Sequence, residues 1–230
     1  MAALRVGVIL SGCGYRDGAE IHESVLALLA LDRAGAEVHC FAPNVEQTVV
    51  VDHLRGEAVA TERRNVLVES ARIARGKIAD VRSAQASDLD AVVLPGGFGA
   101  AMNLSTFGSK GAAGEVNADV ARLLREMHAA KKPIGAICIA PAVVAKALGF
   151  AHPRLTIGDD RETAAAIVAC GAVHEACPVD SFVIDRENRI VSTPAYMLGP
   201  SIRHVAEGIE RCIAAVVALA GERTAATLPR

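Results

Sequence analysis

The chain has 230 residues, 52% of them hydrophobic and 22% charged, so disorder is excluded and a substantial core can form. The net charge is −2, aromatic residues make up 3% and tryptophan is absent, which argues against a nucleic-acid partner. The apolar runs are too short to span a membrane and no signal peptide precedes the first strand. We therefore expect no membrane partner and a cytoplasmic location.

Apolar stretches typical of buried strands alternate with amphipathic stretches typical of helices. Two of the predicted helices are closed by a glycine, Gly35 and Gly76, which favours a helix C-terminus. The predicted strands lie at 4–10, 37–42, 89–94, 134–137 and 154–157, and the predicted helices at 21–33, 65–75, 118–131, 141–148 and 161–170. This order predicts right-handed βαβ units and a mostly parallel sheet that is covered on both faces.

The pattern changes near the C-terminus. Two short strands at 182–185 and 189–192 are separated by a polar turn and predict a late β-hairpin. A long final helix is predicted at 201–220. No repeat or linker divides the chain, so we expect one α/β domain over residues 1–221 and a frayed tail at 222–230.

Cys138 follows the predicted strand at 134–137 and directly precedes the helix that begins near Pro141. A strand-to-helix turn of this kind presents a nucleophile at the carboxyl edge of the sheet, where ligand sites gather. The free N–H groups and positive potential of a helix N-terminus favour the thiolate. The alternative is a buried, unreactive cysteine. The context favours a reactive thiol that is kept ionised.

Two other loops end at the same edge. Gly96, Gly97 and Gly99 follow a buried strand, and their backbone N–H groups could form an oxyanion hole or only a tight turn. The loop at 11–20 carries Gly12-x-Gly14, but Asp17 stands where a dinucleotide fingerprint needs a third glycine, so we expect no nucleotide cofactor.

Glu20 and Glu23 open the next predicted helix. One of them is expected to cap the helix, and the other could point toward the thiol and move protons.

Further residues are candidates for the border of the pocket. Cys13, Thr193 and Tyr196 lie on the loops at this edge, and His22 stands between the two acids, where a solvent-facing or capping role is favoured. The pair at 159–160 could bind a cation but is more typical of a helix cap, and we expect no metal site.

Five stretches together resemble the ElbB family of the ThiJ/PfpI superfamily, whose fold is like that of class I glutamine amidotransferases. They are ILSGCGYRDGAEIHESV, VLPGGFGAAMNLSTF, PIGAICIAPAV, LTIGDD and ACPVDSFVIDRENRIVSTPAYM. The resemblance implies a flavodoxin-like three-layer α/β/α sandwich, a homodimer and no cofactor. It implies that Cys138 is the nucleophile, that Glu23 is its partner acid, and that Gly97 and Ile139 supply the oxyanion donors.

The implied activity is that of a glutathione-independent glyoxalase, which turns glyoxal into glycolate, so the expected partner is a small aldehyde substrate. Two features set the chain apart from other branches. Ile139 stands where the peptidase-like branch has a histidine, and neither His174 beside Glu175 nor His204 before Glu207 gives the His-x-Glu of the glutaminase branch. The competing hypothesis is a redox or electrophile sensor, or an accessory protein of isoprenoid metabolism, that uses the same cysteine.

Overall fold

A seven-stranded sheet forms the centre of the computed structural model, which describes residues 3–227. The strand order is β10-β11-β7-β6-β1-β2-β5, and every neighbouring pair is parallel except β10 and β11. The strands are β1 (Arg5–Ile9), β2 (Glu37–Ala42), β5 (Ile78–Asp80), β6 (Ala91–Leu94), β7 (Ile134–Ile137), β10 (Val183–Asp185) and β11 (Ile190–Thr193). The prediction of an α/β fold with a mostly parallel sheet and a late hairpin is confirmed.

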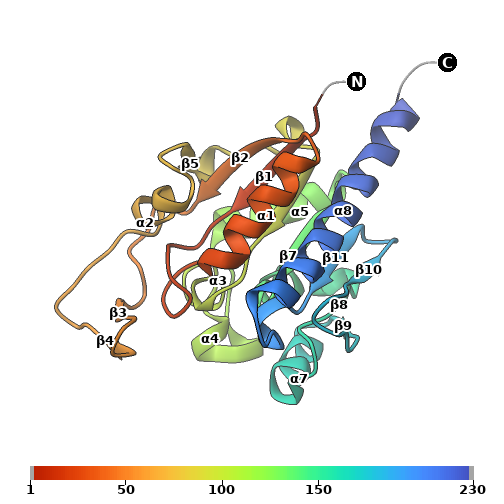
Figure 1. The fold of residues 1–230 in the computed structure, drawn as a ribbon. Helices are drawn as coiled ribbons and strands as arrows, with labels where there is room; N and C mark the ends of the chain where they lie inside the picture. The colour runs from red at the N-terminus through yellow and green to blue at the C-terminus, as the bar shows by residue number, and fades with distance from the viewer. Residues whose placement is uncertain (1–2, 228–230) are drawn as a thin grey trace.

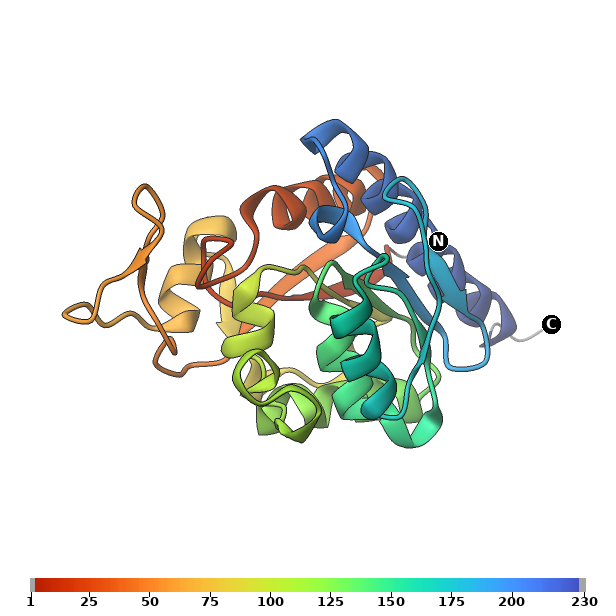
Figure 2. The ribbon, with the colours of Figure 1, turned by 90° about the horizontal axis from the view of Figure 1, so that it is seen from below.

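Helices cover both faces of this sheet, so the molecule has three layers (Figures 1 and 2). Helices α1 and α8 lie side by side on one face, and α5 and α6 cover the other. Their bounds are α1 (Ile21–Arg33), α5 (Ala118–Ala129), α6 (Ala140–Leu148) and α8 (Ile202–Thr227). The shorter helices are α2 (Val66–Ile73), α3 (Phe98–Met102), α4 (Phe107–Lys110) and α7 (Arg161–Ala169).

The central strands contribute side chains to two hydrophobic cores, because successive side chains of a strand point to opposite faces of the sheet. In β6, Ala91 and Val93 belong to the core beneath α1 and α8, whereas Val92 and Leu94 belong to the core beneath α5 and α6. Gly135 in β7 lets α8 approach closely, since a Cβ atom there would lie 3.0 Å from Val216. Burial on both faces explains why these strands read as continuous apolar runs.

Two small sheets lie outside the central one. Strands β3 (Val51–Asp52) and β4 (Glu57–Ala58) pair in an excursion that projects from the body of the molecule (Figure 2). Strand β8 (Arg154–Leu155) pairs with β9 (Val173–His174). The strand predicted at 154–157 is therefore shorter than expected and lies outside the central sheet.

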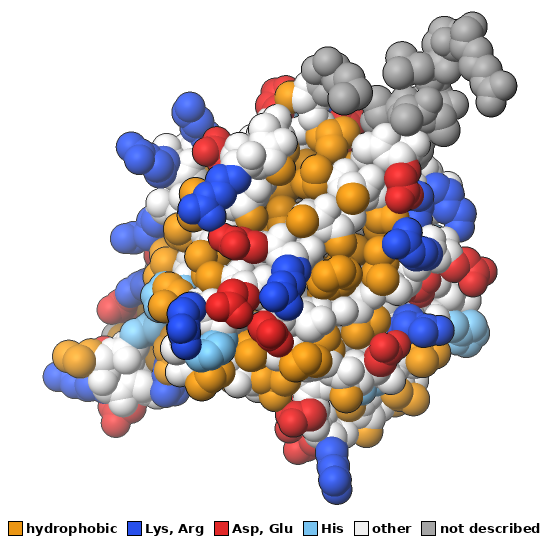
Figure 3. Space-filling view, turned by 45° about the vertical axis from the view of Figure 1, so that its right-hand side comes forward, with side chains coloured by type: hydrophobic (Ala, Val, Ile, Leu, Met, Phe, Trp, Pro, Cys, Tyr) orange, Lys and Arg blue, Asp and Glu red, His pale blue; other side chains and the backbone are white. Residues whose placement is uncertain are grey.

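The final helix is longer than predicted, because α8 continues to Thr227 instead of ending at 220. It therefore includes residues 222–227 of the predicted tail, and 228–230 lie outside the described residues. Among the helices of the described chain, none combines the length and apolar character needed to cross a bilayer. On the face shown in Figure 3, acidic and basic side chains are interspersed with hydrophobic ones.

Candidate functional site

Cys138 occupies the sharp turn between β7 and α6, as predicted. Its φ is +61°, in the left-handed region that a residue with a side chain adopts at an energetic cost. The turn is held by a hydrogen bond of 2.9 Å from the Cys138 N–H to the carbonyl of Thr193. Cys138 directly follows the last residue of β7, so the thiol lies at the carboxyl end of the parallel strands.

Glu23 meets Cys138 from the first turn of α1. Its side chain is fully buried and shares a side-chain hydrogen bond with the Cys138 thiol. The Gly96 N–H donates to Oε2 at 2.9 Å, and the Tyr196 N–H donates to Oε1 at 3.2 Å. A Cβ atom at Gly96 would lie 2.4 Å from the Cβ of Cys138 and 2.7 Å from Oε2 of Glu23. Glycine at this position is therefore what allows thiol and carboxyl to meet.

The two acids at the start of α1 have different tasks. Glu20 is the N-cap residue, and its Oε2 accepts a hydrogen bond of 2.7 Å from the Glu23 N–H. This bond caps the first turn of α1, while the side chain of Glu23 is buried beside Cys138. The structure thus separates the capping acid, Glu20, from the acid beside the thiol, Glu23, which residue chemistry alone left open and the family resemblance had assigned to Glu23.

Burial decides the protonation of the pair. Burial, followed by the negative charge of Glu20, raises the pKa of Glu23 to about 8. Burial, followed by the charge of Glu23, raises the pKa of Cys138 well above its ordinary value. Near pH 7 both groups therefore hold a proton. The prediction that Cys138 rests as a thiolate is therefore wrong. Cys138 is only 7% exposed, and desolvation raises the pKa of its thiol by more than the helix N-terminus lowers it.

Two backbone N–H groups converge on the sulfur. Those of Gly97 and Ile139 hydrogen-bond to Cys138 and act to lower its pKa. Gly97 has φ +90°, and a Cβ atom there would lie 2.4 Å from the Glu20 nitrogen, so this turn requires glycine. Such a pair of donors can hold a negative charge that develops on or beside the sulfur.

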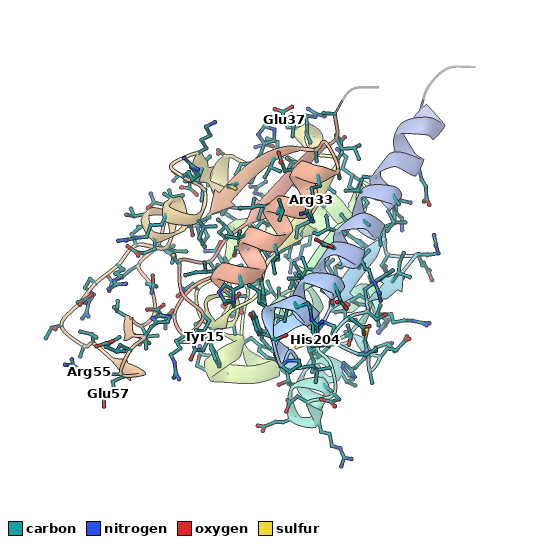
Figure 4. All side chains as sticks on the ribbon, in the orientation of Figure 1. Tyr15, Arg33, Glu37, Arg55, Glu57 and His204 are labelled. Carbon is teal, nitrogen blue, oxygen red and sulfur yellow. The ribbon has the colours of Figure 1, made fainter. Side chains whose placement is uncertain are left out.

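A cavity of about 780 Å³ opens above this group and includes Cys138, Gly97 and Ile139 in its wall. In Figure 4 one wall residue, Tyr15, lies at the opposite end of the sheet from Glu37. Because Glu37 begins strand β2, the cavity lies at the carboxyl edge of the sheet. The other wall side chains are of two kinds: Phe98, Tyr196 and Met197 are apolar or aromatic, whereas Glu20, His22, Asp160 and Thr163 are charged or polar. Those that the sequence analysis did not single out are Tyr15, Phe98, Thr163 and Met197.

The predicted border residues divide into two groups. Tyr196 and His22 lie in the cavity wall, and the Tyr196 hydroxyl is 2.8 Å from Nδ1 of His22. Gly96 and Thr193 lie behind the pair and hold it through backbone groups, while the Thr193 hydroxyl donates to the carbonyl of Ser181 at 2.7 Å. Neither of them lines the cavity.

Cys13 also lies outside the wall. It is half-buried on the loop after β1, and burial, followed by the charge of Glu69, raises the pKa of its thiol, which Arg72 partly offsets.

Asp160 has the capping role that the sequence favoured, because its carboxylate accepts a hydrogen bond of 2.8 Å from the Thr163 N–H at the start of α7. It also lines the cavity. Across residues 3–227, no three His, Cys, Asp or Glu side chains gather in a way that could hold a metal ion. The wall residues that sequence reasoning missed come from four separate segments, and no single motif includes them. Tyr15 lies on the loop after β1, Phe98 at the start of α3, Thr163 in α7 and Met197 in a 3₁₀ turn.

Comparison with known proteins gives matches over nearly the whole chain. Residues 13–172 match the DJ-1/PfpI family. The chain is 46% identical over 227 residues to the "ES1 protein homolog, mitochondrial" of Rattus norvegicus, covering 95% of this chain and 85% of that protein. It is also 46% identical over 229 residues to the "Glutamine amidotransferase-like class 1 domain-containing protein 3, mitochondrial" of Homo sapiens, covering 96% and 85%.

A solved structure agrees with these matches. The "isoprenoid biosynthesis protein with amidotransferase-like domain" from Ehrlichia chaffeensis has a TM-score of 0.87 and 43% sequence identity, covering 94% of this chain and 99% of that one. The ThiJ/PfpI resemblance and the amidotransferase-like fold are thereby confirmed, and the narrower ElbB resemblance stays a prediction. The expected cytoplasmic location is contradicted, because the rat, human and Danio rerio relatives are all named mitochondrial and point to a mitochondrial location.

Proposed function

The chain belongs to the DJ-1/PfpI family, and from this premise we propose that it is a cofactor-independent glyoxalase acting on glyoxal or a related 2-oxoaldehyde. The product is a 2-hydroxy acid, which is glycolate when glyoxal is the substrate. The observation that carries this proposal is the buried hydrogen-bonded pair of Cys138 and Glu23 at an open cavity. The reaction needs no external oxidant, since one carbon of the substrate is oxidised while its neighbour is reduced.

The first step is addition of the thiol to the aldehyde carbon. The pair becomes reactive when it has lost one of its two protons, because the remaining proton can stay on Glu23 while the sulfur attacks. A carbon–sulfur bond forms as the carbonyl π bond breaks, and the N–H groups of Gly97 and Ile139 stabilise the negative oxygen. Transfer of the Glu23 proton to that oxygen gives a thiohemiacetal.

The second step moves hydrogen between the two carbons. The Glu23 carboxylate, now free of its proton, removes the hydrogen from the sulfur-bearing carbon, and the second oxygen takes up a proton to give an enediol. Glu23 then returns its proton to the neighbouring carbon while the hydroxyl on the first carbon releases its proton. The thiohemiacetal becomes a thioester. Water then attacks the thioester, which releases the 2-hydroxy acid and restores the Cys138 thiol.

The test is glycolate release from glyoxal by purified wild-type protein and by Cys138→Ala, Glu23→Gln and Cys13→Ala. We expect the Cys138 and Glu23 variants to lose at least about 1000-fold in kcat/KM, because both act on the reacting atoms. Cys13→Ala is the matched control and should retain wild-type turnover, since Cys13 lies outside the cavity wall. Equal turnover in all four proteins would refute the proposal.

A sensor function would use the same cysteine. Oxidation and the proposed reaction both begin from the thiolate, so the raised pKa of Cys138 does not separate the two functions. The cavity of about 780 Å³ beside the thiol favours the enzyme, because it offers room for a small substrate. Mass spectrometry of the intact protein after mild peroxide would support the sensor only if Cys138 is oxidised selectively while glyoxal turnover is negligible. An accessory role in isoprenoid metabolism rests only on the name of the Ehrlichia chaffeensis relative.

A further inference from the structure

A second polar pair lies in the same cavity wall as Cys138. The hydroxyl of Tyr196 is 2.8 Å from Nδ1 of His22, and the two rings are tilted with centroids 5.9 Å apart. We propose that His22 and Tyr196 form a proton-transfer dyad that serves the second carbonyl group of the substrate. This inference rests on the proposed glyoxalase function and assigns residues that the family resemblance does not.

The dyad is built from the same segments that hold the acid of the first pair. His22 precedes Glu23 on α1, and the Tyr196 N–H donates to Oε1 of Glu23. Tyr196 lies in the short 3₁₀ turn Ala195–Met197, which follows β11. Any substrate bound to Cys138 with its first carbon beside Glu23 therefore has the two dyad residues in the wall of the same cavity.

The chemistry requires such a donor. The N–H groups of Gly97 and Ile139 are directed at the sulfur and serve the first carbonyl oxygen. The second oxygen becomes negative when Glu23 removes the hydrogen from the first carbon, and it must take up a proton. Ile139 has a hydrocarbon side chain, so the side chain after the nucleophile cannot donate a proton to the second oxygen.

The proton balance closes through His22. As the enediol forms, the second oxygen takes the phenolic proton of Tyr196, and the phenolate takes a proton from Nδ1 of His22. The His22 side chain is exposed, so its ring can replace that proton from solvent. When the thioester forms, the hydroxyl on the first carbon releases its proton to solvent. No net proton is gained or lost, and no outside oxidant or reductant takes part.

The cavity offers a matched control because its wall contains a second tyrosine. Nε of Arg16 donates a hydrogen bond of 2.7 Å to the hydroxyl of Tyr15, so this hydroxyl has an arginine partner in place of a histidine. We expect Tyr196→Phe to lower kcat for glyoxal and methylglyoxal about 100-fold with KM changed less than about twofold, as for the loss of a general acid. Tyr15→Phe measures the loss of a wall hydroxyl that is no part of the dyad, and we expect Tyr196→Phe to lower kcat at least about tenfold more than Tyr15→Phe does.

Two readouts separate proton transfer from a structural effect. The rate at which iodoacetamide alkylates Cys138 should be unchanged in Tyr196→Phe, because the phenol does not act on the sulfur. His22→Ala should lose about tenfold in kcat, and added imidazole should restore part of that loss. Chemical rescue is expected because the side chain removed is exposed to solvent.

The outcomes are distinguishable. If the wild type releases no 2-hydroxy acid from either substrate, the glyoxalase proposal fails and the dyad fails with it. If the wild type is active but Tyr196→Phe behaves like Tyr15→Phe, the dyad alone is overturned. If Tyr196→Phe does not fold, imidazole rescue of His22→Ala decides, and its absence overturns the dyad.

Discussion

Cys13 and Cys138 follow strands of the same parallel sheet, yet their surroundings differ in two physical respects. In the Cys13 loop the positive φ angles fall on the neighbouring Gly12 and Gly14, whereas at the other loop Cys138 itself adopts φ +61°. Cys138 shares a buried hydrogen bond with Glu23, while Cys13 is half-buried and experiences both negative and positive charges. A position at the carboxyl edge of the sheet is thus not enough to define a catalytic site. What distinguishes Cys138 is backbone strain on the cysteine itself and a fixed partner acid.

The pH dependence of stability gives the largest expected contrast between the two cysteine sites. Burial and the charge of Glu20 raise the pKa of Glu23 from 4.5 to about 8, so the folded protein binds more protons than the unfolded chain between these pH values. The contribution of Glu23 to stability is complete below about pH 4.5 and is lost as pH rises to about 8. Replacing it by Gln should remove this fall, which amounts to about 4 kcal/mol between pH 5 and pH 8.

Urea unfolding at several pH values measures this effect. The readout is the slope of the unfolding free energy against pH, because Gln at position 23 also changes the hydrogen bonds and hence the absolute stability. Cys13→Ala is the control and should keep the wild-type slope. Identical slopes for Glu23→Gln and the wild type would show that the Glu23 carboxyl is not held protonated. The Cys138 site would then differ from the Cys13 site in backbone strain but not in electrostatics.

Crowding the backbone around Cys138 and Glu23 should change the free energy of unfolding by less than the pH effect of Glu23. A methyl group at Gly96 would lie 2.4 Å from Cβ of Cys138 and 2.9 Å from the carbonyl oxygen of Ile137, and neither atom is the end of a flexible side chain. We expect Gly96→Ala to destabilise the protein by about 2–3 kcal/mol in urea unfolding.

Gly108 in α4 provides the matched substitution. Its added Cβ would lie 3.1 Å from Cγ of Met102, whose side chain can move, and 3.3 Å from the carbonyl oxygen of Ala101, which is tight but far from the 2.4 Å contact at Gly96. Gly108→Ala should therefore change stability by less than about 1 kcal/mol. If the two alanine variants are equally stable, the close approach of Gly96 to the pair is not a constraint on the fold.

The sequence predicted what is encoded locally and missed what depends on assembly. The turn at Cys138, the glycines after β6 and the hairpin of β10 and β11 each occupy a short segment with its own pattern. Strand β5 has three residues, too few to establish a period. The cavity wall combines Phe98 at the start of α3 with Met197 in the 3₁₀ turn after β11, and no sequence spacing connects the two.

Protonation was missed for a related reason. The helix N-terminus beside Cys138 is visible in the sequence and favours a thiolate. The full burial of Glu23 is visible only in the folded chain, and it reverses that expectation. An argument from local electrostatics therefore needs the desolvation of both partners before it can assign a charge.

The smallest predicted contrast concerns how fast each cysteine reacts as the pH changes. The Cys138–Glu23 pair should lose its first proton near pH 8, the value to which burial raises the pKa of Glu23. Alkylation of Cys138 by iodoacetamide should then rise about tenfold from pH 7 to pH 9 and level off. Burial and Glu69 raise the pKa of Cys13 above 9.0, so its rate should rise about 100-fold over the same range without levelling.

Peptide mass spectrometry resolves both sites in one sample, so each cysteine is the internal control for the other. In Glu23→Gln the carboxyl that loses its proton near pH 8 is absent, and the curve for Cys138 should no longer bend there. The Cys13 curve should not change, since Glu23 is not among the charges that act on it. A bend near pH 8 that survives in Glu23→Gln would assign the titration to another group, and Cys138 would then differ from Cys13 in strain and burial alone.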